Sequence, residues 1–590
     1  MNTSSKSKLV KMMLVNAVLV LPISHIYAQV IFTAPELIGR VSDHSVTINA
    51  ETNLSVQYYF EYGTEAGFYD DRLPQSGYNT SIANQPLEVT FEALVPNTQY
   101  YYRLVYRLDE SSDWIMRDAY SFHTQRSQES DFVFTITSDS HQSAGGPAQP
   151  RNLYHQTLSN VQADDPDLHF DLGDTFAMTT IEIGDTVETR AEYLSQRISM
   201  GEISHSTPVY LVVGNHEEEE GWNLDDAGAD VALSKPIMSI NARKKYFLNP
   251  IPDGFYSGNP DQSQLEIEDN HLRENYFSFE WGGALFVGID PYANTLTKPF
   301  SGTAGGEQND EVVGDRWDWT LGEDQYLWFK ETLESSSAQW KFVFSHQVVG
   351  GTSDYGRGGA EATTGYEWGA GSIAFSAHRP GWSNSTSIHQ LMLENGVNIF
   401  FHGHDHVYAR EEIDGMIYQE CPQPSDVQYS SGFDSYQSDA STVVVNNSGH
   451  LRVSVSPEAL TVDYIRAYLS GDGSNGSIGH SYSISSTSSI EPQAPELARN
   501  FELYQNYPNP FNPSTTIRYI LAEDALVSLI VYDLRGGVVQ TLESGLKAAG
   551  GHESIWRGDT SSGVLANAGI YFAHLVSGGH HQVIKLVYQK

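Results

Sequence analysis

The chain has 590 residues, which is too long for one ordinary hydrophobic core and indicates about three or four structural units. Its 74 acidic residues against 33 basic residues give a formal net charge of -41, a field that repels nucleic acid and anionic lipid. We therefore expect no nucleic-acid binding. The single cysteine, Cys421, excludes an intramolecular disulfide, and we interpret it as an inert structural residue.

The first residues have the layout of a secretory signal peptide. Lysines precede a mostly apolar run from Met12 to Ile23, and the small residue Ala28 stands before Gln29. We predict that residues 1–28 are a signal peptide outside the fold. The apolar run is short for a permanent span, and no later stretch approaches the ~20 apolar residues that a span needs, so no transmembrane helix is expected.

Residues 29–126 are predicted to form a β-sandwich. Short runs such as Ser45–Ala50, Val56–Tyr62 and Thr98–Tyr106 alternate apolar and polar residues between Gly, Asn and Pro turns. The segment from Leu94 to Leu104, LVPNTQYYYRL, resembles the late-strand signature of fibronectin type III modules. The module also resembles the sandwich that precedes the catalytic domain of purple acid phosphatases. We interpret it as a packing and spacing unit, with carbohydrate or partner binding as the alternative.

Residues 127–468 alternate apolar strand runs with amphipathic helical stretches, which predicts an α/β layered domain. The stretch from Glu217 to about Asn275 interrupts this alternation and is interpreted as an inserted lid or rim. Strands are predicted at Phe132–Thr137, Leu168–Leu172, Val209–Val213, Lys341–Phe344, Val397–Phe401, Thr442–Val445 and Leu451–Tyr464. Helices are predicted at Arg151–Gln162, Val187–Met200, Glu323–Leu333 and Ser387–Glu394.

The last part of the chain is predicted to be a linker followed by a small second β-sandwich. Residues 469–498 are dominated by Ser, Gly, Pro and Asn without apolar periodicity, which is typical of a flexible linker. Residues 499–590 contain strand-like runs such as Thr516–Ile520, Val527–Tyr532 and Gly569–Val576.

The opening of this last domain, YQNYPNPFNP from Tyr504 to Pro513, resembles the type A sorting domain of type IX secretion substrates. The later GIYF at Gly569 and the final KLVYQK at Lys585 extend the resemblance over nearly the whole domain. It implies that the type IX secretion machinery is a partner, and that the protein crosses an outer membrane and is then released or attached to the cell surface. An ordinary sandwich explains the strands but not the dense Asn-Pro opening.

In the central domain, residues of the types that bind metals follow apolar strand runs. The carboxyl ends of strands form the ligand-binding edge of open α/β sheets, so we expect these residues to converge there. His141 lies two residues after the first of them and His406 two residues after the last. One such residue would be weak evidence for a metal site, because an isolated His or Asp at a strand end is more often structural. The whole set is strong evidence. The residues that follow the strands are Asp139, Asp174, Asn215, His346 and His404.

The order DSH at Asp139, GD at Gly173, GNHE at Gly214, His346 and GHDH at Gly403 resembles the calcineurin-like metallophosphoesterase superfamily motif by motif. The resemblance implies an αββα layered fold and two metal ions, with a bridging hydroxide as nucleophile. Zinc, manganese and iron all suit mixed imidazole and oxygen ligands. One ion would be held by Asp139, His141, Asp174 and His406, and the other by Asp174, Asn215, His346 and His404.

Within the superfamily, the run from Gly403 to Arg410 and the N-terminal sandwich are similar to the purple acid phosphatases. Those enzymes place a metal-binding tyrosine three residues after the bridging aspartate, where this chain has Ala177. The resemblance therefore implies that the chromophore of tyrosinate bound to ferric iron is missing.

Other residues near these motifs have two interpretations each. The resemblance implies that His216 protonates the leaving alkoxide, and the alternative is a purely orienting role. Asp171 and Asp405 are interpreted as acceptors that orient ligand imidazoles, or as solvated carboxylates or caps. His402 shares a strand face with His404 and His406, and we interpret it as a buried, hydrogen-bonded residue.

Two arginines are candidates for substrate binding. Arg357 lies in the Gly-rich stretch after His346, where a guanidinium fork could reach a phosphate group. Arg410 follows the GHDH motif. For both residues the alternative is a simple surface position.

The sequence as a whole predicts a secreted or surface-attached phosphoesterase that hydrolyses phosphate esters, most of all phosphomonoesters, in a reaction that requires metal ions. Phosphodiesterase or nucleotidase activity is the first alternative, because the ligand set is shared. A surface adhesion or binding protein with a non-catalytic central domain is the second. The intact ligand set argues against it.

Overall fold

The fold is taken from a computed structural model. Residues 1–28, which are the predicted signal peptide, and Arg357 lie outside the residues it describes. Within the described stretches, no helix combines the length and the apolarity needed to cross a membrane. The described residues are 29–142, 151–259, 267–268, 270–298, 316–348, 367–368, 379, 386–431, 442–486, 502–503, 506, 509–521, 525–547, 550–561, 564–577 and 580–589.

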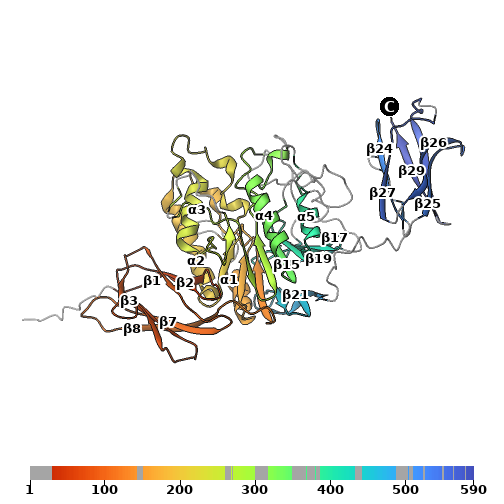
Figure 1. The fold of residues 1–590 in the computed structure, drawn as a ribbon. Coiled ribbons are helices and arrows are strands. Elements are labelled where there is room, and N and C mark those ends of the chain that lie inside the picture. Colours follow the sequence, from red (N-terminus) through yellow and green to blue (C-terminus); the bar gives the residue numbers. More distant parts are fainter. Residues whose placement is uncertain are drawn as a thin grey trace, which may run out of the picture.

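The N-terminal region consists of two antiparallel sheets, in the orders β1-β2-β6 and β4-β3-β7-β8, with β5 paired to β3 (Figure 1). Alternation in β7 explains the shared core, because Tyr100, Tyr102 and Leu104 are buried whereas Tyr101 and Arg103 are more exposed. The strands are β1 (Phe32–Gly39), β2 (Val46–Thr52), β3 (Gln57–Gly63), β4 (Asp71–Leu73), β5 (Asn79–Thr80), β6 (Pro86–Phe91), β7 (Gln99–Arg107) and β8 (Ile115–His123).

The central region contains two larger mixed sheets. The first has the order β11-β10-β9-β20-β21-β22, and β9, β10 and β11 run parallel. Its strands are β9 (Phe132–Thr137), β10 (Leu168–Asp171), β11 (Val209–Leu211), β20 (Gly449–Val455), β21 (Ala459–Arg466) and β22 (Ile478–Ser485). The second has the order β12-β13-β14-β15-β16-β18-β17-β19, and β14, β15, β16 and β18 run parallel. Its strands are β12 (Ser257–Gly258), β13 (Phe277–Trp281), β14 (Ala284–Gly288), β15 (Trp340–Phe344), β16 (Ile399–His402), β17 (Tyr408–Ile413), β18 (Met416–Glu420) and β19 (Val443–Val445).

Aromatic side chains fill the space between the two central sheets. Phe170 of β10 stacks on Phe344 of β15 with ring centroids 4.2 Å apart, and Phe134 meets Phe286 and Phe342 from the facing sheet. Successive residues of a strand point to opposite faces, so Val343 and Phe400 pack instead on the outer side, under helices. Because both faces of these strands are buried, one against the other sheet and one under helices, their sequences are almost continuously apolar.

Helices cover both outer faces, so the layers run helix, sheet, sheet, helix (Figure 1). Helices α1, α2 and α3 pack on the first sheet through Tyr154, Tyr193 and Tyr246, and α4 and α5 pack on the second through Phe329 and Leu391. The helices are α1 (Arg151–Ala163), α2 (Thr186–Ser204), α3 (Lys235–Tyr246), α4 (Glu323–Ser335) and α5 (Ile388–Glu394).

The stretch predicted as a lid or rim contains α3 and is partly packed into the domain. Arg243 of α3 is buried and forms an ion pair with Glu219, with Nε 2.7 Å from Oε1. The same guanidinium donates to the main-chain oxygens of Arg273 and Glu274. These contacts join α3 to both ends of the stretch. Asn249 ties the stretch to β11, because its side chain accepts from Leu211 N at 3.0 Å and donates to Leu211 O at 2.9 Å.

The predicted linker is wrong for residues 478–485, where the structure has β22. This strand pairs antiparallel with β21 along its whole length. It is an edge strand in which more and less exposed residues alternate, and Tyr482 and Ile484 pack against the core. A strand with one neighbour and one covered face needs few apolar residues, so its Ser and Gly content resembles that of a linker.

The C-terminal region forms two further sheets, in the orders β23-β24-β27 and β26-β25-β28-β29. Ile517, Leu529, Trp556, Leu575 and Leu586 form its separate core. The strands are β23 (Glu502–Leu503), β24 (Thr515–Leu521), β25 (Ala525–Asp533), β26 (Val538–Lys547), β27 (Gly550–Trp556), β28 (Gly569–Ser577) and β29 (His580–Tyr588). The sorting role assigned to this region from its sequence stays a prediction.

Candidate metal centre

Both central sheets contribute to one cluster of polar side chains. Asp139, Asp174 and Asn215 follow β9, β10 and β11 of the first sheet, and His346 and His404 follow β15 and β16 of the second. Parallel strands end at the same edge of each sheet, and the stacked sheets bring their two edges together. The predicted ligand residues therefore do meet at the carboxyl ends of strands, but the strands belong to two sheets and not to one.

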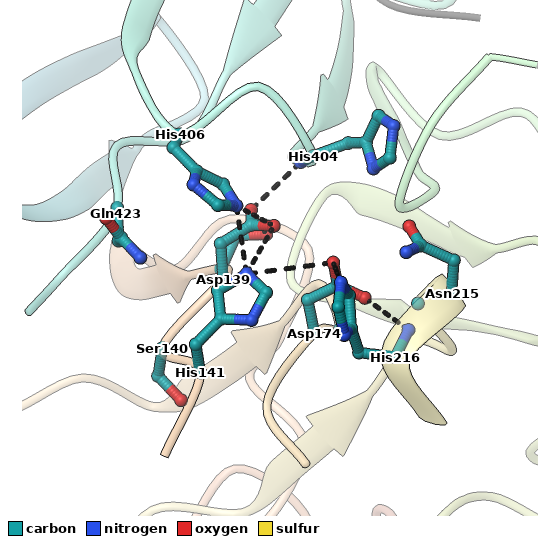
Figure 2. Close-up of polar contacts among 12 residues, drawn as sticks. Asp139, Ser140, His141, Asp174, Asn215, His216, His404, His406 and Gln423 are labelled. Atoms are coloured by element: carbon teal, nitrogen blue, oxygen red, sulfur yellow. Dashed lines mark hydrogen bonds and ion pairs between the residues drawn. The ribbon is translucent and has the colours of Figure 1, made fainter. Parts of the chain in front are cut away.

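On one side of the cluster, four residues place donor atoms within 4.8 Å of one another. His141 Nε2 lies 2.9 Å from His406 Nε2, and Asp139 Oδ1 lies 3.4 Å from the latter (Figure 2). The carboxylate of Asp174 closes the group, with Oδ2 3.8 Å from His141 Nε2.

On the other side, His346 lies at the centre of a second group that shares Asp174. His346 Nε2 is 3.3 Å from Asp174 Oδ2, 3.2 Å from His404 Nδ1 and 3.1 Å from Asn215 Oδ1. The donor atoms of Asp174, His346 and His404 also lie within 4.8 Å of one another. Asp174 is therefore placed between the two groups, which is the place of a bridging ligand.

The electrostatics of the cluster favour added positive charge. Burial opposes ionisation of Asp139, but the charges of His346 and His406 lower its pKa to about 2. Burial and the neighbouring His406 lower the pKa of His141 to about 3. Although burial acts against it, Asp174 and Asp139 raise the pKa of His346 to about 10. Ionised carboxylates and neutral imidazoles are the forms that bind metals, so Asp139 and His141 already have these forms, whereas His346 would release its proton to an incoming ion.

The donor set fits a pair of metal ions. Asp139 Oδ1 is fully buried and has no hydrogen-bond partner among the residues that the structure describes, although Oδ2 of the same carboxylate accepts from Ser138 Oγ and His404 N. A buried acceptor without a hydrogen bond is unfavourable unless a cation faces it. Imidazole nitrogens mixed with carboxylate oxygens suit zinc, manganese or iron, and the donors do not select among them.

The backbone at the cluster is strained. Five residues that carry a β carbon have left-handed φ values, a conformation that costs roughly 1 kcal/mol or more for each. Such strain gathers at functional sites, where the surrounding structure enforces it. These residues are Asp139 (60°), His141 (45°), Asp174 (53°), His404 (84°) and His406 (57°).

Close approach between the loops explains the glycines of the motifs. A β carbon on Gly173 would lie 2.4 Å from Gly214 N, and one on Gly214 would lie 2.4 Å from Asp174 N. A β carbon on Gly403 would lie 2.0 Å from Ser138 Oγ. Since real β carbons do not come this close to other atoms, larger residues would push the ligand-bearing loops apart.

His216 lies beside the cluster without joining either donor group. Its Nε2 is 3.8 Å from Asp174 Oδ2, and its backbone N–H donates to Asp174 Oδ1 at 2.8 Å. Thr179 Oγ1 lies 3.4 Å from the other ring nitrogen. With its side chain 26% exposed, His216 borders the accessible face of the cluster together with His141 and His406.

Several of the other predicted roles differ from what the structure shows. Asp171 accepts from Thr137, Thr175 and the N–H of Gly173, so it orients a loop and not an imidazole. The acceptor that orients His346 is instead the backbone oxygen of Leu172, 2.8 Å from Nδ1.

His402, Asp405 and Arg410 lie on or beside β16 and β17. His402 is buried, with Nδ1 2.5 Å from Glu420 Oε2, which agrees with its interpretation as a hydrogen-bonded strand residue. The N–H of Asp405 donates to the same carboxylate. Arg410 lies on β17, forms an ion pair with Glu412 and lies over the ring of Tyr482 from the edge strand β22 of the other central sheet.

Residues 132–408 match the family model of calcineurin-like phosphoesterases. The chain therefore contains a calcineurin-like phosphoesterase domain and is a metal-dependent phosphoester hydrolase. No curated protein sequence matches the chain significantly.

The solved structures similar to the chain include PhoD and a purple acid phosphatase. The structure of PhoD is 13% identical, with a TM-score of 0.52, over 77% of this chain and 90% of that chain. Purple acid phosphatase PPD1 from seeds of yellow lupin (Lupinus luteus) is 15% identical, with a TM-score of 0.48, over 76% of this chain and 74% of that chain. At these identities, the likeness to PhoD shows a shared fold.

Proposed function

We propose that the protein hydrolyses phosphomonoesters at a two-ion centre. One ion would be held by Asp139, His141, Asp174 and His406, and the other by Asp174, Asn215, His346 and His404. The observation that carries the proposal is the position of Asp174 Oδ2, which faces His141 on one side and His346 on the other. Ions bound there supply an activated water and offset charge on the phosphoryl group.

The exposure of the donors supports a terminal phosphoryl group as the substrate. Asp139, Asp174 and His346 are almost completely buried, whereas His141 and His406 are 18% and 23% exposed. The cluster is therefore approached from its histidine side. A phosphomonoester presents its reacting group at one end and needs one such approach.

In the same proposal His216 gives a proton to the leaving oxygen. Its side chain lies on the accessible side and next to Asp174, but outside both donor groups. An imidazole can hold and release a proton at neutral pH, which suits proton transfer to a leaving oxygen. The orientation of the ring is supported by Thr179, whose hydroxyl lies at the other nitrogen.

We further propose that the enzyme is exported. The support is the signal-peptide layout of residues 1–28 and the resemblance of residues 499–590 to a type IX sorting domain. Fractionation of cells that produce the full chain tests this point, and retention of the mature protein in the cytoplasm would contradict it.

The test of the activity uses the full chain loaded with zinc, manganese or iron. We expect two ions per chain and release of inorganic phosphate from an aryl phosphomonoester. The corresponding diester and a nucleotide serve as comparison substrates. Faster hydrolysis of the diester would overturn the monoester assignment, and absence of any hydrolysis by the metal-loaded protein would overturn the proposed function.

A further inference from the structure

The loop that follows β10 donates its backbone N–H groups to buried carboxylates. This pattern is continuous from residue 173 to residue 177, through the position of Asp174. The pairs are Gly173 to Asp171 Oδ1 (3.2 Å), Asp174 to Glu217 Oε2 (2.9 Å), Thr175 to Glu217 Oε1 (2.8 Å), Phe176 to Glu217 Oε1 (3.1 Å) and Ala177 to Glu192 Oε1 (3.2 Å).

Glu217 makes most of these contacts from a different loop. It ends the 3-10 helix Asn215–Glu217 after β11, and its Oε2 also accepts the N–H of Gly214 at 2.5 Å. Each carboxylate oxygen therefore accepts two backbone N–H groups, and the residue is only 2% exposed. Concave arrangements of backbone N–H groups bind anions, and here the anion is the carboxylate of Glu217.

The contact between the two loops is reciprocal. Glu217 reaches from the second loop to the N–H of Asp174, and the N–H of His216 in the second loop donates to Asp174 Oδ1 at 2.8 Å. We call these two reciprocal contacts, Glu217 with Asp174 N and His216 N with Asp174 Oδ1, the clasp. The clasp sets both the orientation of the Asp174 carboxylate and the position of Asn215. In the first donor group only Asp174 belongs to these two loops. Asp139 and His141 come from the loop after β9, whose backbone N–H groups donate to Gly173 O and Asp174 O, and no hydrogen bond joins either of them to Glu217 in the described part of the chain.

We propose that Glu217 is a positioning residue that sets the spacing between Asp174 and Asn215, and thereby the affinity of the ion that both would hold. The inference rests on the proposed two-ion centre. Its consequence is selective, because the ion held by Asn215, His346 and His404 depends on the clasp more than the ion at Asp139 does.

The test replaces Glu217 with Gln in the full chain. The amide keeps the size of the side chain but turns an NH₂ group toward backbone N–H donors, so two of the four contacts are lost. We expect one ion to bind about 10- to 100-fold more weakly, as for other groups that orient metal ligands, and the other ion to keep its affinity. The measurements are calorimetric titration of the metal-free protein with zinc and metal content after dialysis.

Glu192→Gln is the matched control. Glu192 accepts the N–H of Ala177 through Oε1, and an amide oxygen can accept the same hydrogen bond. We expect wild-type affinity for both ions in this variant. Circular dichroism and the thermal midpoint of the metal-free protein report separately whether each variant is folded.

The outcomes separate the inference from the proposed function. A wild-type chain that binds fewer than two ions contradicts the two-ion centre itself. If the wild type binds two ions and folded Glu217→Gln binds both with unchanged affinity, the positioning role is wrong. Equal weakening of both ions, or the same loss in Glu192→Gln, also contradicts it. If Glu217→Gln does not fold, Glu217→Asp is measured instead. We expect this variant to lose less affinity, and to lose it for the same one ion. Unchanged affinity for both ions would contradict the positioning role.

Discussion

Asp174 carries more constraints than any other residue of the cluster. Its side chain faces both donor groups, its N–H is held by Glu217, and its backbone has a left-handed φ of 53°. We predict that Asp174→Ala loses at least one ion and lowers turnover of every substrate by roughly 10³-fold or more, because the bridging anion is removed.

Metal content and rates measured together check this prediction, and Asp171→Asn is its control. Asp171 is buried three residues earlier and accepts from Thr137, Thr175 and Gly173, and an Asn side chain can satisfy the same three contacts. This variant should keep both ions. Full occupancy with near-normal rates in Asp174→Ala would remove Asp174 from the bridging position.

His216 should differ from Asp174 in the kind of loss its replacement causes. In His216→Ala both ions stay, because the side chain belongs to neither donor group. The rate should fall about 10²- to 10⁴-fold for an alkyl phosphate that needs a proton on its leaving oxygen. It should fall little for an activated aryl phosphate. Rates on the two substrates give the answer, and an equal loss on both would contradict the acid role.

At the scale of elements, periodic helices could be predicted closely and elements with buried polar groups could not. Helix α2 was expected from Val187 and begins at Thr186, with Asp185 as its N-cap. Helix α3 was missed because it buries Arg243 in an ion pair, so its buried face looks polar in the sequence. The run Leu451–Tyr464 is two strands, β20 and β21, separated by a turn around residues 456–458.

The cluster itself was predictable only in part. Ligand-type residues after apolar strands indicated which side chains meet, because strand ends share an edge. The two stacked sheets were implied by the family resemblance. The contacts of the Glu217 side chain were not predictable. A side chain that accepts backbone N–H groups from a loop some 40 residues away leaves no residue pattern, since every residue except proline offers the same donor.

At the scale of the molecule, a buried arginine joins the N-terminal sheets to the central domain. Arg197 of α2 donates to the backbone oxygens of Pro35, Asn49 and Tyr246 and is fully buried. We predict that Arg197→Met lowers stability by about 3 kcal/mol, because these buried oxygens lose their donors. The midpoint of thermal unfolding checks this.

Arg190, on the same helix, provides the control for Arg197. It forms an ion pair with Glu51, with Nη2 3.0 Å from Oε2, and its side chain is 35% exposed. Glu51 itself is buried but also accepts a hydrogen bond from Thr33 Oγ1, and Arg190 is partly hydrated, so Arg190→Met should shift the midpoint less than Arg197→Met. Equal shifts in the two variants would show that burial of Arg197 does not stabilise the junction.

The position of β22 decides where the C-terminal region can be removed. A chain ending at Leu469 lacks β22, which leaves the edge of β21 open and removes the 2.7 Å contact between Tyr408 and His480. A chain ending at Ser486 keeps the strand and the bond from Ser486 N to the backbone oxygen of Glu458.

We predict that the longer truncated chain keeps full turnover and both ions but fails to reach the cell surface. The shorter one should unfold at lower temperature and aggregate, because an open sheet edge pairs with other chains. Rates, thermal unfolding and cell fractionation of both chains are the measurements. Loss of activity in a folded, metal-loaded chain ending at Ser486 would mean that the C-terminal sheets contribute to the reaction.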